Sequence, residues 1–160
     1  TRASLNDQLA MTLGGRAAEE LVFNEITTGA SNDIEKVTST AKAMVMKYGM
    51  SEKLGPRALG HDQANPFLGR SFGAEADYSQ EIAREIDDEI RRIIEDAHER
   101  ARSVLMEHME SLHRLSKILL DRETIDRGQF LKLLDGVPED EVWPQETTQE
   151  TVPEIGRAHV

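Results

Sequence analysis

Residues 79–105, SQEIAREIDDEIRRIIEDAHERARSVL, carry the most regular apolar pattern of the sequence. The apolar residues of this stretch recur every three or four positions with Glu, Asp and Arg between them, as expected for a helix with one apolar side and one charged side. The residues of the apolar stripe are Ile82, Ile86, Ile90, Ile93, Ala97, Ala101, Val104 and Leu105. A stripe of this length predicts one long amphipathic helix whose apolar side is covered by other helices.

The first helix is predicted over residues 3–23, with Ser4 as its N-cap. Its apolar residues recur every fourth position: Leu5, Leu9, Leu13, Ala17 and Leu21. Gly14-Gly15 lies in the middle of this helix and should cost about 1 kcal/mol per glycine relative to alanine. Such a pair is explained either by another helix that approaches closely or by a local weak spot, and the pattern leaves both open.

A second helix is predicted after the turn-rich connection at residues 24–33, NEITTGASND. Asn32 and Glu35 resemble a capping box, and Gly49 is a good C-terminal stop. The residues expected on the inner side of this helix are Ile34, Val37, Ala41, Met44, Val45 and Tyr48.

One long irregular loop is expected at about residues 50–77, where glycines and prolines break the chain repeatedly. A connection of this length inside a compact domain is more often functional than idle. It has no Gly-Lys-Ser/Thr ending, so it is not a phosphate-binding loop. Ala58-Leu59 and Phe67-Leu68 are the two candidates for short extended pieces.

Two helices are expected after the long one. The first covers about residues 109–120, and the pattern does not decide whether it continues the long helix. Its apolar residues are Leu112, Leu115 and Leu119. The second is short, is capped by Thr124 and ends near Leu134, because Gly136 and Pro138 stop it.

The last segment, residues 138–160, holds three prolines and six acidic residues against one arginine. A segment with this composition buries too little apolar surface to fold, so a disordered acidic tail is expected. The predicted fold is therefore all-α, with a helical domain over residues 1–137, the irregular loop and this tail.

The composition supports the all-α prediction. Of the 160 residues, 38% are hydrophobic, 31% are charged and only 4% are aromatic. Long helices with charged outer sides have this composition, whereas β-sandwiches need more Val, Tyr, Phe and Trp. There are no cysteines, which excludes disulfides, thiolate zinc sites and cysteine nucleophiles.

Charge and hydropathy limit the partners of the chain. The formal net charge of −11 repels phosphate backbones, which argues against nucleic-acid binding. No apolar run approaches the ~20 residues needed to span a bilayer. The chain has neither an initiator Met nor a signal peptide at Thr1, so we expect it to begin in the middle of a longer protein.

Two Glu-x-x-His pairs, Glu95 with His98 and Glu110 with His113, are candidates for a metal site because di-iron helical bundles use two such motifs. At 100° per residue, both glutamates point away from the apolar sides of their helices. A solvated charged surface is therefore favoured over a di-iron centre. The sequence contains no HExxH zinc-binding motif. It also contains no Gly-x-Ser-x-Gly motif, so nothing in it supports a serine hydrolase.

Asp33 is a different candidate, because it opens the second helix after a glycine-containing turn that holds a carboxylate rigidly. Acidic residues in a first helical turn also stabilise the free N–H groups and the helix dipole. Since a lone Asp specifies no metal site, spacing alone favours the dipole role over metal ligation. Glu19 and Glu20 are adjacent on the first helix and cannot both face one partner, so one is expected to point inward and the other into solvent.

Six short motifs also occur in a fixed order. They are residues 13–20 (LGGRAAEE), 27–34 (TTGASNDI), 48–51 (YGMS), 54–56 (LGP), 67–70 (FLGR) and 123–126 (ETID). In this order and spacing they resemble the C-terminal part of the peptidase domain of FtsH-type proteases, which are membrane-anchored, ATP-dependent zinc endopeptidases. The resemblance covers residues 1 to about 134 and leaves the acidic tail outside.

The resemblance implies roles for particular residues. Zinc in this family is bound by the two histidines of an HExxH helix and by the aspartate of the TTGASND turn, which Asp33 matches. Glu19 matches a glutamate near the zinc site and is expected to orient a ligand. Residues 55–73 match a segment that flanks the site. Gly14-Gly15 would then be the place where the HExxH helix packs closely.

The resemblance also implies what this chain lacks. The HExxH segment with its general base, the ATPase module that binds ATP and Mg²⁺, and the transmembrane helices would all lie upstream of Thr1. The parent protein is expected to be a homo-hexamer on the cytoplasmic side of a bacterial plasma membrane that degrades unfolded polypeptides. The chain alone is expected to be inactive. The competing hypothesis is a non-catalytic helical module for oligomerisation, in which the long charged helix packs against neighbouring subunits.

Overall fold

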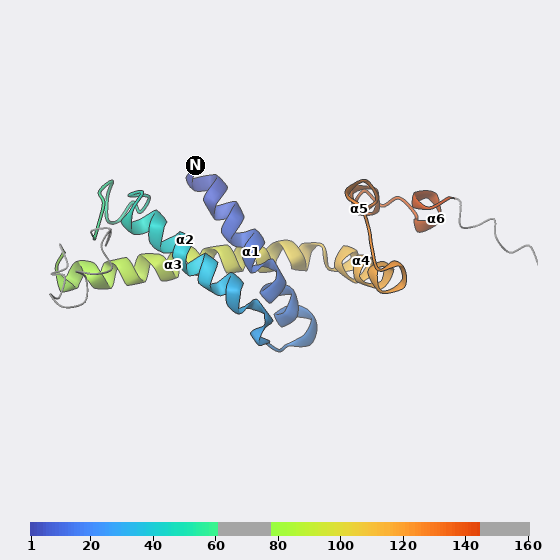
Figure 1. Ribbon diagram of the computed structural model, residues 1–160, viewed down its shortest axis with the longest axis horizontal. Helices are drawn as coiled ribbons and strands as arrows, with labels where there is room; N and C mark the ends of the chain where they lie inside the picture. The colour runs from blue at the N-terminus through green and yellow to red at the C-terminus, as the bar shows by residue number, and fades with distance from the viewer. Residues whose placement is uncertain (61–77, 145–160) are drawn as a thin grey trace, which may run out of the picture. The chain divides into compact units, whose positions relative to one another are not determined.

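The computed structural model describes residues 1–60 and 78–144, and these described residues form helices and turns without any strand. The predicted all-α fold is confirmed (Figure 1). The chain divides into two compact units, Thr1–Glu107 and His108–Val160.

The first unit contains α1 (Arg2–Phe23), the short 3₁₀ helix η1 (Thr28–Ala30), α2 (Ser31–Met46) and α3 (Gln80–Glu107). In Figure 1, α1 and α2 both lie across the long α3, and each of the three helices packs against the other two. The core residues are Leu9, Leu13, Val37, Ala41, Met44, Val45, Leu54, Leu59, Ile86, Ile93 and Ala97. The long amphipathic helix predicted from residues 79–105 therefore serves as the platform of this unit.

The stripe on α3 is buried only where α1 and α2 cover it. Ile86, Ile93, Ala97 and Ala101 are buried, whereas Val104, near the end of the helix, is 49% exposed. One buried residue of α3, Glu89, is charged and was not part of the predicted stripe.

Two N-caps of the first unit differ from the prediction. Thr1 caps α1, and its hydroxyl accepts a hydrogen bond from the Ser4 amide at 3.1 Å, so Ser4 is not the cap. No capping box forms at Asn32 and Glu35, because the chain enters α2 directly from η1 and Ala30 stands at the N-cap without a side-chain hydrogen bond.

The segment after α2 turns back onto the helix that it leaves. α2 ends at Met46, and Tyr48, beyond the helical phase, is 54% exposed rather than inward as predicted. Gly49 adopts φ +60°, and the Leu59 amide donates to the Met46 carbonyl at 2.7 Å. Leu59 is buried without belonging to a strand. The other predicted extended piece, Phe67-Leu68, lies outside the described residues.

The second unit contains α4 (Met109–Arg122), α5 (Arg127–Leu134) and α6 (Glu139–Val142) around a small core of Ile118, Leu133 and Val142. His108 separates α4 from α3. The inner residue of α4 is Ile118, whereas Leu119, which was predicted to face inward, is 44% exposed.

Asp126, not Thr124, caps α5, and it forms a capping box with Gln129. Thr124 cannot cap because the chain is still turning at that point, with Glu123 at φ +65°.

The prediction of a disordered tail from residue 138 is wrong for residues 138–144. α6 buries Val142, and the Arg122 guanidinium stacks on the Trp143 ring with its carbon 3.8 Å from the ring centre. Arg122 also pairs with Glu139 at 3.0 Å. Val142 and Trp143 thus attach to the second unit a segment whose acidic composition predicted disorder. Residues 145–160 lie outside the description.

Candidate metal-binding site

Asp33 lies in the first turn of α2, where its side chain is half-buried. The turn that precedes it is almost wholly exposed, and Ala30, at 8% exposure, is its buried anchor. Because η1 leads into α2 without a break, the direction of the Asp33 side chain depends on how η1 is held. The helix start also favours a negative charge at this position.

Glu19, on α1, holds η1 in place. Its carboxylate accepts hydrogen bonds from the Thr27 amide at 3.3 Å and from the Thr27 hydroxyl at 3.0 Å. The Thr27 hydroxyl oxygen in turn accepts from the Gly29 amide at 3.3 Å, which caps η1. A hydrogen bond to a charged group is stronger than one between neutral groups, and the surrounding water weakens it at this exposed turn. Glu19 therefore fixes the turn that carries Asp33, although no direct contact joins the two carboxylates.

Glu20 contacts a different element. One of its oxygens lies 3.0 Å from Nε2 of His98 on α3, and the other lies 3.5 Å from Nε of Arg16. Both Glu19 and Glu20 are half-buried, so the expectation that one of them points freely into solvent is wrong. Sequence reasoning missed the pairing of Glu20 with His98, because only the crossing of α1 over α3 brings these two residues together.

The other acidic candidates lie at the surface. Glu95 and Glu110 are both exposed, in agreement with their helical phase. Within residues 1–60 and 78–144, no three His, Asp or Glu side chains come together in a group that could hold a metal ion. A zinc ion bound by Asp33 would therefore need further ligands from outside these residues.

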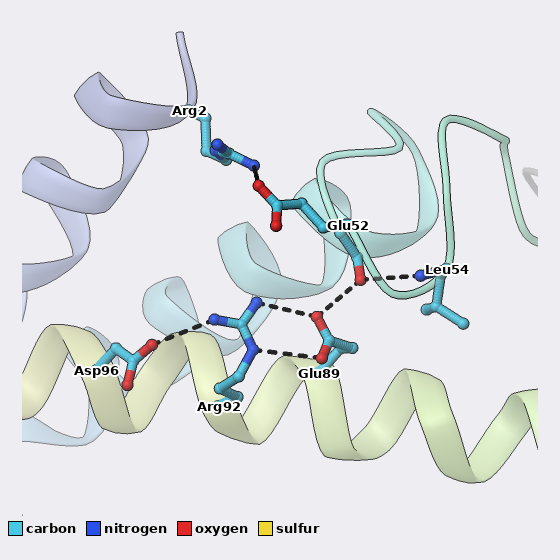
Figure 2. A network of polar contacts seen from close by, with 7 residues as sticks. Arg2, Glu52, Leu54, Glu89, Arg92 and Asp96 are labelled. Carbon is cyan, nitrogen blue, oxygen red and sulfur yellow. Dashed lines mark hydrogen bonds and ion pairs between the residues drawn. The ribbon is translucent and has the colours of Figure 1, made fainter.

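A second polar cluster joins α3 to the segment after α2 (Figure 2). The buried Ser51 hydroxyl donates to Glu89 at 2.7 Å and accepts from the Leu54 amide at 3.3 Å. Arg92 donates to both oxygens of Glu89, at 3.2 and 2.9 Å, and to Asp96 at 3.2 Å. Hydrogen bonding from Arg92 holds the pKa of Glu89 below its ordinary value, with Ser51 contributing and burial opposing.

A cavity of about 750 Å³ adjoins this cluster. Its lining combines the side chains of Arg2, Glu52, Arg92, Asp96 and Arg100 with an apolar floor that includes Met44 and Ile93. Arg2 pairs with Glu52, and Arg100 pairs with Asp7, so these guanidinium groups are already partnered within the chain. Neither Asp33 nor Glu19 lines this cavity, which is therefore separate from the candidate metal site.

Among the helices of the described residues, none is long and apolar enough to cross a membrane.

The fold and the turn together define an all-α segment with one carboxylate at a helix start, held through the preceding turn by a second carboxylate. The sequence model of peptidase family M41 matches residues 1–133. The chain belongs to peptidase family M41.

Similar proteins carry a consistent description. The chain is 66% identical over 148 residues to the ATP-dependent zinc metalloprotease FtsH 1 of Conexibacter woesei, covering 92% of this chain and 23% of that protein. It is 53% identical over 137 residues to the ATP-dependent zinc metalloprotease FtsH of Rhodococcus erythropolis, covering 86% of this chain and 16% of that protein. It is 47% identical over 136 residues to the ATP-dependent zinc metalloprotease FtsH 1 of a Thermoanaerobacter species, covering 85% of this chain and 22% of that protein. The chain thus spans less than a quarter of the length of these curated relatives.

Proposed function

We propose that this chain is the C-terminal part of the peptidase domain of an ATP-dependent zinc endopeptidase, and that Asp33 is one of its zinc ligands. The observation that carries this proposal is the fixed turn before Asp33. Glu19 binds both the amide and the hydroxyl of Thr27, and Thr27 caps the 3₁₀ helix that leads into α2. A metal ligand needs such support, because residues that orient a ligand contribute strongly to metal affinity.

The donor chemistry of Asp33 fits zinc. Carboxylate oxygens bind Zn²⁺, and catalytic zinc sites use three protein ligands with one open position. Asp33 would supply one ligand, and an HExxH segment outside this chain would supply two histidines and the general base. When bound, zinc supplies Lewis-acid assistance to amide hydrolysis. With one ligand and no general base, the chain alone would be inactive.

The relatives named ATP-dependent zinc metalloproteases support the wider proposal. The parent protein would couple ATP hydrolysis in a separate module to degradation of unfolded polypeptides. It would assemble as a homo-hexamer and be tethered to the cytoplasmic side of a bacterial plasma membrane through segments outside this chain. Nucleic acid is not expected among its partners, since the net charge of this chain is −11.

The test is Asp33→Asn in the full-length protease, with Glu35→Gln as the matched control. Asp33→Asn removes the acidic residue in the first turn of α2, whereas Glu35→Gln removes an exposed negative charge two residues later in the same helix, so the control shows the effect of losing a charge near the helix start. If Asp33 binds zinc, Asp33→Asn lowers zinc affinity by more than about 100-fold and abolishes proteolysis. Glu35→Gln leaves both unchanged.

Zinc content is measured by metal analysis after dialysis against a chelator, and proteolysis is measured on an unfolded protein substrate. Retention of zinc and proteolysis by Asp33→Asn would show that the carboxylate serves the helix start only, and the proposed ligand would be wrong.

A further inference from the structure

The end of α1 that carries Glu19 lies beyond Ala17, the last fully buried residue of this helix. α1 contributes Leu9, Leu13 and Ala17 to the buried residues, and none of the α1 residues after Ala17 is buried. Of its last six residues, 18–21 are half-buried and 22–23 are exposed, so polar contacts add to the packing that holds this end of the helix. Glu19 lies in this stretch, and the placement of Thr27 depends on it.

Two polar contacts show that α1 crosses α3 steeply. Asp7 of α1 pairs with Arg100, and Glu20 pairs with His98. The two α1 residues are separated by roughly 20 Å along the helix axis, but their two partners on α3 are separated by only about 3 Å. Figure 1 shows the same crossing of α1 over α3. Helices that cross steeply touch over a short stretch, so contacts on either side of the crossing help to fix the angle.

The contact on the side of Glu19 is the better protected of the two. The side chains of His98 and Glu20 are 29% and 24% exposed, whereas those of Arg100 and Asp7 are 58% and 60% exposed. Exposed ion pairs contribute little, because solvent screens them and both long side chains lose freedom. The Glu20 carboxylate is also held by Arg16 from its own helix.

We infer that His98 is a positioning residue for the candidate metal site: by binding Glu20 it fixes the end of α1, and so holds Glu19 where it can bind Thr27 and set the turn before Asp33. This inference rests on the proposed function, since the turn matters as the support of a metal ligand. His98 touches neither Asp33 nor Glu19 and acts only through α1.

The experiment measures amide hydrogen exchange, residue by residue, in the chain of 160 residues. The reporters are the amides of Thr27 and Gly29, which donate to Glu19 and to the Thr27 hydroxyl. His98→Phe keeps a ring but removes the nitrogen that meets Glu20. It should raise exchange at both reporters about fivefold, the effect of one average hydrogen bond, while the core amides of α2 change less.

Two variants make the result specific. His98→Gln keeps a side-chain N–H that can donate to Glu20, so it should exchange at the reporters at close to the parental rate. Glu95→Gln, an exposed change one turn earlier on α3, should leave the reporters unchanged. If His98→Phe unfolds the chain, Glu20→Gln, which weakens the same contact with almost no change of side-chain volume, replaces it.

The inference is overturned if the reporters exchange at parental rates in His98→Phe, or if all amides of the first unit accelerate equally, or if His98→Gln behaves like His98→Phe. None of these outcomes bears on whether Asp33 binds zinc, which the Asp33→Asn experiment decides. Failure of the positioning role and failure of the zinc proposal are therefore distinguishable.

Discussion

Glu19 and Glu20 are adjacent on α1, yet their carboxylates contact different elements. Glu19 binds Thr27 in the turn before α2, and Glu20 meets His98 on α3. Neighbouring helical residues point about 100° apart, so a pair of this kind can connect one helix to two others. Single side chains of this unit thus decide how its elements are joined.

Among the described residues, Glu89 is the charged residue that lies buried in the interior, at 6% exposure. Its titration predicts that the free energy of unfolding falls at acid pH. Its pKa is lowered in the folded chain, chiefly by Arg92. A carboxyl group with a lowered folded pKa stabilises the fold above its unfolded pKa, and this contribution disappears as the pH falls through the folded pKa. Glu89→Gln should therefore cost about 2 kcal/mol near pH 7 and less below the ordinary pKa of 4.5.

Urea unfolding followed by circular dichroism at pH 7 and pH 3 measures this difference. The control is Asp96→Asn, which removes the exposed partner of Arg92 and should change the free energy of unfolding by less than about 0.5 kcal/mol. An equal loss for Glu89→Gln at both pH values would contradict the assigned role of its charge.

Gly49 and Gly55 distinguish two reasons for a glycine: a backbone conformation with positive φ, and a lack of space for a side chain. Both have positive φ, at +60° and +80°, but a Cβ at Gly49 would lie 2.9 Å from backbone atoms of Pro56 and Arg57, whereas a Cβ at Gly55 would meet nothing within 4 Å. Gly55→Ala should cost about 1 kcal/mol for the backbone conformation alone. Gly49→Ala should cost at least about 2 kcal/mol more, because backbone atoms must move. Thermal unfolding of the two variants measures the two costs. Equal losses of unfolding free energy would show that the backbone of residues 49–57 can move apart at little cost.

At the scale of the element, α1 has one packed side and one unpacked side. Leu9, Leu13 and Ala17 are buried, while Met11 on the other side is 77% exposed. Gly14 and Gly15 lie within the continuous helix and have no close neighbour, since a Cβ at either position would meet nothing within 4 Å. The close approach of another helix that was predicted at this pair is therefore not made by the described residues of this chain.

Gly14→Ala should stabilise the isolated chain by about 1 kcal/mol, because alanine is the better helix former and the space is open. The same substitution in the full-length protease should lower proteolysis if the HExxH helix packs against this point. Chemical denaturation of the chain and a protease assay of the full-length protein measure the two effects. Stabilisation in the chain together with unchanged proteolysis would leave the glycine pair as a weak spot only.

At the scale of the whole molecule, the chain consists of two units that each have a core. The boundary at Glu107 and His108 falls within the range that the family matches, residues 1–133. The second unit extends beyond that range, because α6 and Trp143 complete its small core.

Val142→Ala tests whether the acidic segment belongs to the fold. Val142 is 8% exposed, and losing its two methyl groups should destabilise the second unit by about 1–2 kcal/mol. Trp143 is the only tryptophan, so its fluorescence during urea unfolding reports on this unit. Val22→Ala, at a 41% exposed position of α1, is the control and should leave the fluorescence transition unchanged. Identical transitions for the two variants would mean that residues 138–144 add nothing to the core.

The sequence was sufficient to predict the helices, because the three- and four-residue repeats of apolar side chains specify which side of each helix is buried. It also determined the family, through short motifs whose order does not depend on knowing the fold. It was less successful at helix starts, where Thr1 and Asp126 replace the predicted caps, because capping depends on the local backbone direction.

The contacts between distant polar residues follow from the packing of the helices and were not predictable from the sequence. Nothing in the spacing of Glu20 and His98, or of Ser51 and Glu89, indicates contact, since they are 78 and 38 residues apart. Likewise, the composition of residues 138–144 predicted disorder, but a core already formed by Ile118 and Leu133 gives Val142 a place to be buried. Periodicity encodes the side of a helix that is apolar, whereas the crossing of helices decides which distant residues become neighbours.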